Sequence, residues 1–86
     1  MTKFLITYDL KEGQDYEVLY KAIKDLSSSY WHGMQNVWFV KTTLTASQIR
    51  DELENHVKTD DKLFVCELDD WASYNLSADG ASWLKS

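Results

Sequence analysis

The stretch Phe4-Leu5-Ile6-Thr7-Tyr8-Asp9-Leu10 decides the fold of this chain, because it is an apolar run interrupted by an aspartate. Residues 3–8 are apolar enough to predict a strand that is covered on both faces. Aspartate is a poor strand residue, so we expect Asp9 where this strand ends. There it is either a turn-forming cap or a carboxylate offered to a metal ion.

The segments that follow alternate between helix and strand patterns. A polar loop at 11–14 leads to Asp15, which is expected to cap a helix with apolar residues at helical spacing as far as Leu26. Serines 27–29 end that helix, since serine favours local turns. Two short strands, at 30–34 and 37–41, then predict an antiparallel hairpin.

The second half of the chain continues with a helix and a strand. Thr45 and Gln48 have the spacing of a capping box, and the helix that they open is expected to run to about Val57. A turn at 59–61 then leads into a strand at 63–68.

The order strand, helix, strand, strand, helix, strand predicts an α+β fold, the ferredoxin-like βαββαβ sandwich. It has a four-stranded antiparallel sheet with two helices on one face, and its core spans about residues 3–68 of a single 86-residue domain. The extension at 69–86 begins as a loop or a short added strand and ends in a helix at 78–84, capped by Ser77. The tail, a second subunit or both are expected to cover the bare face of the sheet.

Composition narrows the class of protein. A net charge of −5 and a pI near 4.8 weigh against a generic nucleic-acid binder. Four Trp and five Tyr are many for a small chain and predict self-association as a homodimer. The single cysteine, Cys66, excludes an internal disulfide and is expected to be a buried hydrophobe. With no basic leader and no apolar run of membrane length, the chain is expected to be cytoplasmic, without a membrane partner.

The strand ending in Tyr8-Asp9, the helix after it and the segment Gln35-Asn36-Val37-Trp38-Phe39 resemble the small CRISPR-associated endonuclease family. Members of that family form the dimeric subunit that accompanies the CRISPR integrase in spacer acquisition. The chain resembles most its uncharacterised SinR-like relatives, which have a Trp-rich tail, and more distantly virulence-associated protein D, a toxin ribonuclease. The resemblance covers roughly residues 3–68.

The resemblance implies roles for two residues. Asp9 matches the strand-end aspartate that faces its symmetry mate in the homodimer and holds a divalent metal, Mg²⁺ or Mn²⁺. Phe39 matches the aromatic residue of the second hairpin strand. The chain departs from the family in its first helix, where only Lys21 and Lys24 replace several arginines, and at Val40, where the family often has glutamate.

Other residues have two readings each. His32 suits a general base for phosphodiester chemistry, but also a histidine on a sheet face or at an interface. Trp31 and Trp38 are candidates for stacking on unpaired bases, and equally for packing in a core or an interface. The pairs Asp60-Asp61 and Asp69-Asp70 are expected to be solvated turns rather than a metal cluster.

These residues and the resemblance to the CRISPR-associated endonuclease family together imply two functions from different classes. The first is a dimeric, non-catalytic or weakly active scaffold in nucleic-acid processing or defence, which acts on a protein partner or on itself. The excess of acidic over basic residues favours this first function. The second is a Mg²⁺-dependent endonuclease, acting on RNA or DNA, in which Asp9 of both protomers holds the metal and Thr7, on the same side of the strand, supports it.

Overall fold

The computed structural model describes residues 1–11 and 15–86, so the polar loop predicted at 12–14 lies outside the described residues. The elements follow one another as β1 (Thr2–Asp9), α1 (Tyr16–Leu26), β2 (Ser29–Met34), β3 (Val37–Thr42), α2 (Ala46–Leu53), the 3₁₀ helix η1 (Glu54–His56), β4 (Lys62–Glu67) and α3 (Ala78–Lys85). This order confirms the predicted alternation of strands and helices, and Asp9 is indeed the last residue of its strand.

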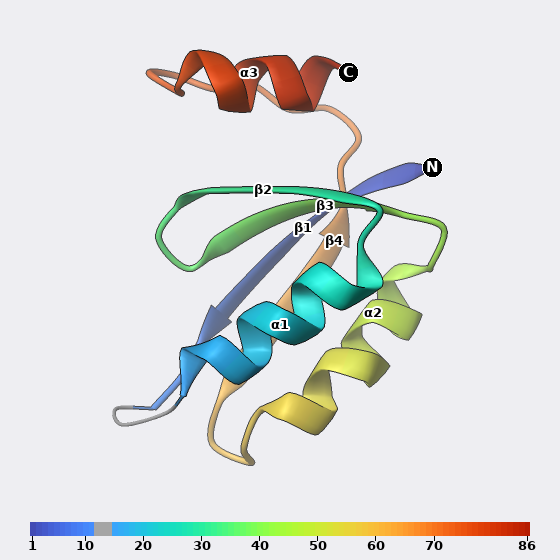
Figure 1. Ribbon diagram of the computed structural model, residues 1–86, viewed down its shortest axis with the longest axis vertical. Coiled ribbons are helices and arrows are strands. Elements are labelled where there is room, and N and C mark those ends of the chain that lie inside the picture. Colours follow the sequence, from blue (N-terminus) through green and yellow to red (C-terminus); the bar gives the residue numbers. More distant parts are fainter. Residues whose placement is uncertain (12–14) are drawn as a thin grey trace.

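The strands form one antiparallel sheet in the order β2-β3-β1-β4. Helices α1 and α2 lie on one face of it, and α3 lies on the opposite side (Figure 1). We call the face under α1 and α2 the first face, and the other the second face. The chain is thus a small α+β protein with a four-stranded antiparallel sheet and three α-helices, compatible with a ferredoxin-like plan. The predicted description gave no strand order, and it placed two helices on the sheet with a further helix expected in the tail at 78–84, which is α3.

Strand β1 lies at the centre of the sheet and supplies the middle of the core. Phe4, Ile6 and Tyr8 alternate toward the first face and are almost fully buried. They pack with the inner residues of the neighbouring elements, among them Leu19, Ile23, Trp38, Val40, Ile49 and Leu53. Full burial of each large apolar side chain contributes roughly 1.5–3 kcal/mol, so this face carries most of the stabilisation.

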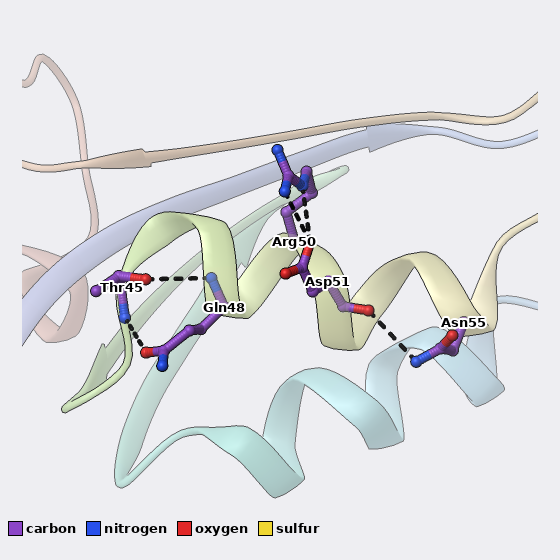
Figure 2. Close-up of polar contacts among 5 residues, drawn as sticks. All are labelled: Thr45, Gln48, Arg50, Asp51 and Asn55. Carbon is purple, nitrogen blue, oxygen red and sulfur yellow. Dashed lines mark hydrogen bonds and ion pairs between the residues drawn. The ribbon is translucent and has the colours of Figure 1, made fainter.

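The helix caps confirm the predicted starts. The Asp15 carboxylate accepts from the Glu17 N–H, and the Ser77 hydroxyl accepts from the Gly80 N–H. Figure 2 shows the reciprocal pair at α2, where the Thr45 hydroxyl accepts from the Gln48 N–H (3.2 Å) and the Gln48 side chain accepts from the Thr45 N–H (2.9 Å). These bonds satisfy backbone donors that the first helical turn leaves unpaired.

One predicted boundary differs from the structure. The second α-helix ends at Leu53 rather than near Val57, because the chain tightens into η1, as helix ends often do. Residues 69–76 form a loop, which is one of the two alternatives predicted for them. Within the described part of the chain, no helix is both long enough and apolar enough to span a membrane.

Candidate functional site

Asp9 ends β1 on the second face, where its side chain is exposed. It lies opposite Lys62 of β4 in the strand register. Asp9 does not form the turn cap that was one of its two expected roles. The N–H of Lys11, two residues after Asp9, donates to Asp61 Oδ1 instead (2.9 Å). Among the described residues, no hydrogen bond or ion pair reaches the Asp9 carboxylate. Asp9 therefore presents a carboxylate to solvent at the end of the central strand.

Asp61 is the turn-forming aspartate of this end of the molecule. Its carboxylate also accepts from the N–H of Lys58 (2.8 Å). These two backbone hydrogen bonds, from Lys11 and then Lys58, lower the pKa of Asp61 below its ordinary value. The prediction that Asp60-Asp61 forms a turn is confirmed, and Asp60 is exposed there and pairs with Lys11 (3.3 Å).

Three side chains next to Asp9 form a patch on the second face. Thr7 lies between Val37 of β3 and Phe64 of β4 in the strand register, so the three share this face. Phe64 is 59 % exposed, which is unusual for a large apolar side chain in a sheet. We call Thr7, Val37 and Phe64 the open patch. A depression of about 340 Å³ runs along it past Asp9 and Lys62.

Thr7 is held by the hairpin rather than by Asp9. Its hydroxyl donates to the Asn36 carbonyl (2.8 Å), in the turn between β2 and β3. Asn36 has a φ of 61°, the left-handed conformation that asparagine tolerates better than most residues. Thr7 thus fastens the turn to the central strand, and its hydrogen bond leads away from the Asp9 carboxylate.

Helix α3 covers the other half of the second face. The Trp83 indole N–H donates to the Ser29 hydroxyl (2.7 Å), and the Lys41 ammonium lies 4.9 Å from the centre of the Trp83 ring. The Lys3 ammonium donates to the Leu84 carbonyl near the end of the helix. The tail thus covers part of the bare face, as one of the predicted alternatives had it, and leaves the open patch uncovered.

Trp31 and Phe39 lie under this tail. Phe39 is 7 % exposed and stacks on Trp31, with ring centres 5.7 Å apart. Gly80 of α3 lies directly against the Trp31 indole, where a Cβ would overlap with the ring. Neither Phe39 nor Trp31 contributes to the open patch, so the structure does not bring Phe39 next to Asp9.

A groove remains between the tail loop and the sheet. It has a volume of about 350 Å³ and an apolar lining that includes Leu5, Met34, Phe39, Trp71, Leu76 and Leu84. Most of its lining comes from the loop after β4 and from the second face of the sheet.

Trp38 and His32 lie on the first face, on the opposite side of the sheet from Asp9. Trp38 is 1 % exposed, and its indole N–H donates to the Tyr8 hydroxyl (3.2 Å). His32 stacks on Trp38 with ring centres 4.0 Å apart, and Tyr20 of α1 meets it edge-on. Burial raises the pKa of Tyr8. Burial first, and then the charge of Lys24, lower the pKa of His32, so its neutral form is favoured.

The candidate residues consequently fall into three separate places. Asp9 lies beside the open patch, Trp31 and Phe39 lie under the tail, and His32 with Trp38 lies under α1. Within one chain, therefore, no single site contains both the Asp9 carboxylate and the His32 imidazole. Among the described residues, no three His, Cys, Asp or Glu side chains gather where they could hold a metal ion. Mg²⁺ is usually held by one or two carboxylates together with waters and substrate phosphates, so the Asp9 carboxylate of each chain would supply one such ligand.

The comparisons with known proteins identify no relative: no family model, no curated protein and no solved structure matches this chain.

Sequence reasoning missed Phe64 as a surface residue. It stands in the run Lys62-Leu63-Phe64-Val65-Cys66, in which every residue but the first is apolar and no alternation marks the outer face. The signal lies in the pairing, because Phe64 is opposite Thr7 and two residues from Lys62 on the same side of the strand.

Proposed function

We propose that this chain is a homodimeric scaffold of the CRISPR-associated endonuclease type, with a ferredoxin-like core and an added C-terminal helix. It acts in nucleic-acid processing or defence without catalysis, or with weak nuclease activity. The observation that carries this proposal is the 59 % exposure of Phe64 in the part of the second face that α3 leaves open. Burying such a side chain in an interface contributes roughly 1.5–3 kcal/mol.

The surroundings of Phe64 support a contact with protein. The open patch has the apolar side chains of Val37 and Phe64 on either side of Thr7, and the charged residues Asp9 and Lys62 at its rim. Apolar side chains surrounded by a polar rim are the usual anatomy of a protein interface. A two-fold interface is self-complementary, so one patch of this kind is enough to join two copies.

The test is the mass of the protein in solution at micromolar concentration. Wild type is expected at twice the chain mass of 10.0 kDa, and Phe64→Asp at the chain mass. Val18→Asp is the matched control, because Val18 is 47 % exposed on α1, away from the patch. A monomeric wild type, or a Phe64→Asp variant as dimeric as the control, contradicts the proposal.

A Mg²⁺- or Mn²⁺-dependent endonuclease is the second candidate, favoured by the solvent-facing Asp9 carboxylate beside the open patch. If two open patches pack face to face, each chain contributes one Asp9 carboxylate to a shared ion. The ion would supply charge stabilisation to a phosphodiester of RNA or DNA. Lys62, opposite Asp9, would contribute a positive charge for the phosphate.

Cleavage of short RNA and DNA decides this second candidate. Wild type and Asp9→Asn are compared with Mg²⁺, with Mn²⁺ and with EDTA. Cleavage that needs both the metal and Asp9 supports the endonuclease. Equal cleavage by both proteins, or none in any condition, refutes it and leaves the scaffold.

A further inference from the structure

Two opposite charges lie next to each other on the second face of the sheet. Asp9 of β1 and Lys62 of β4 are opposite each other in the strand register, so their side chains leave the sheet on the same side. Both are exposed, and among the described residues neither side chain takes part in a hydrogen bond or an ion pair. Both charges are therefore free to pair with a neighbouring molecule.

Beside this charge pair, a projecting side chain adjoins a recess. Phe64 is 59 % exposed, and its partner in the register is the much smaller Thr7. The depression of about 340 Å³ is bounded by these two residues and also by Asp9 and Lys62. The same small surface thus carries a protrusion, a recess, a negative charge and a positive charge. A two-fold interface requires such a self-complementary surface.

We propose that the second copy of the homodimer packs face to face on this surface, with the two-fold axis parallel to the strands and between β1 and β4. The inference rests on the proposed homodimer and specifies how its two copies meet. Half a turn about this axis places β1 of each copy over β4 of the other, at the same position along the strands. The Asp9 carboxylate of each copy then faces the Lys62 ammonium of the other, and each Phe64 enters the recess above the other copy's Thr7.

The charges distinguish this axis from its nearest alternative. Because the rotation exchanges β1 and β4, both facing contacts join an ammonium group to a carboxylate, and the two sheets lie about 10 Å apart, within reach of a lysine and an aspartate side chain. If the axis ran directly over β1, Asp9 would face Asp9 of the other copy. Two carboxylates in that position would repel each other unless a cation lay between them.

The proposed axis also separates the two candidate functions. An ammonium group neutralises each Asp9 carboxylate, so the dimer forms without a divalent ion. A shared ion instead requires the axis over β1, where the two Asp9 carboxylates face each other. Pairing of Asp9 with Lys62 therefore goes with the scaffold and not with the endonuclease.

Carbodiimide cross-linking tests which charges face each other, because the reagent joins a carboxylate to an amine in an amide bond only where the two groups are in contact. Equal amounts of isotopically labelled and unlabelled protein are mixed in EDTA and treated with the reagent. A species of twice the 10.0 kDa chain mass is expected, and mass spectrometry should find a peptide that joins Lys62 of one chain to Asp9 of the other. The labelling distinguishes this link from one within a single chain.

The strength of the dimer supplies a second measurement, by sedimentation equilibrium. Lys62→Gln and Asp9→Asn each remove both facing contacts, so each is expected to raise the dimer Kd by roughly two- to thirty-fold. Lys24→Gln is the matched control, because it removes one exposed positive charge on α1, and it should leave the Kd unchanged. All three positions are exposed, so the circular dichroism spectra should match that of the wild type.

The outcomes distinguish this inference from the homodimer on which it rests. A monomeric wild type overturns both. A dimeric wild type overturns the facing arrangement alone if it forms only with Mg²⁺, if it yields no link between Lys62 and Asp9 of different chains, or if Lys62→Gln leaves the Kd unchanged or lowers it.

Discussion

Replacing Gly80 with alanine tests whether α3 is held to the sheet by its close approach to Trp31. Gly80 is buried in the first turn of α3, and a Cβ at this position would overlap with the six-membered ring of the Trp31 indole. The indole has little room to yield, because it stacks on Phe39 and also lies against Gly33. The side chain and the helix must therefore move apart.

The expected magnitude is a balance of two opposed terms. Overpacking of this kind costs roughly 1–3 kcal/mol. Alanine is better than glycine in a helix by about 1 kcal/mol, which offsets part of that cost. The net result for Gly80→Ala is a loss of up to about 2 kcal/mol in the free energy of unfolding, instead of the gain that helix propensity alone predicts.

The assay is urea unfolding followed by far-UV circular dichroism, in a double-mutant cycle with Trp31→Ala. Once the indole is gone, Gly80→Ala should stabilise the protein by about 0.5–1 kcal/mol, so its effect changes sign. Ser82→Ala, at an exposed position of α3, is the control and should change stability by less than about 0.5 kcal/mol. Equal stabilisation by Gly80→Ala in both backgrounds would refute the reasoning.

Three further predictions concern the first face and the caps. Leu53→Ala, at a side chain with 0 % exposure, should cost about 2–5 kcal/mol in urea unfolding, whereas exposed Glu52→Ala should change little. Thr45→Ala removes one half of the capping box with Gln48 and should lower stability by about 1 kcal/mol, and a neutral result would show that the cap is dispensable. The pKa of His32 is lowered in the folded state, so the stability that depends on its neutral form is present above pH 6.5 and is lost as the pH falls toward the folded value. His32→Phe should make the free energy of unfolding depend less on pH below pH 6.5. An NMR titration of His32 with its midpoint above pH 6.5 would contradict the predicted direction of the pKa shift.

Local signals in the sequence predicted the elements well. Asp15, Thr45 and Ser77 cap the three α-helices at the predicted residues, because each cap is a contact between residues only two or three positions apart. The hairpin turn at Gln35-Asn36 is also confirmed, with Asn36 in the left-handed region. Such contacts depend on little beyond the segment itself.

Contacts between residues that are distant in the sequence could not be predicted from the sequence. Nothing near Trp38 shows that its N–H reaches Tyr8, thirty residues away, or that His32 stacks on it. The alternation of β4 is hidden by its apolar run, so the exposure of Phe64 becomes visible only when β1 sets its register. The candidate site was therefore identified only at Asp9, whose position at a strand end is a local property.

The sequence by itself determined which segments become strands and helices and where they are capped, since propensity, periodicity and capping act over a few residues. Only the tertiary structure decided which face each side chain occupies, which half of the second face α3 covers and which residues of that face stay open. Those outcomes depend on strand register and on single distant contacts, such as that of Trp83 with Ser29, whose partners are far apart in the chain.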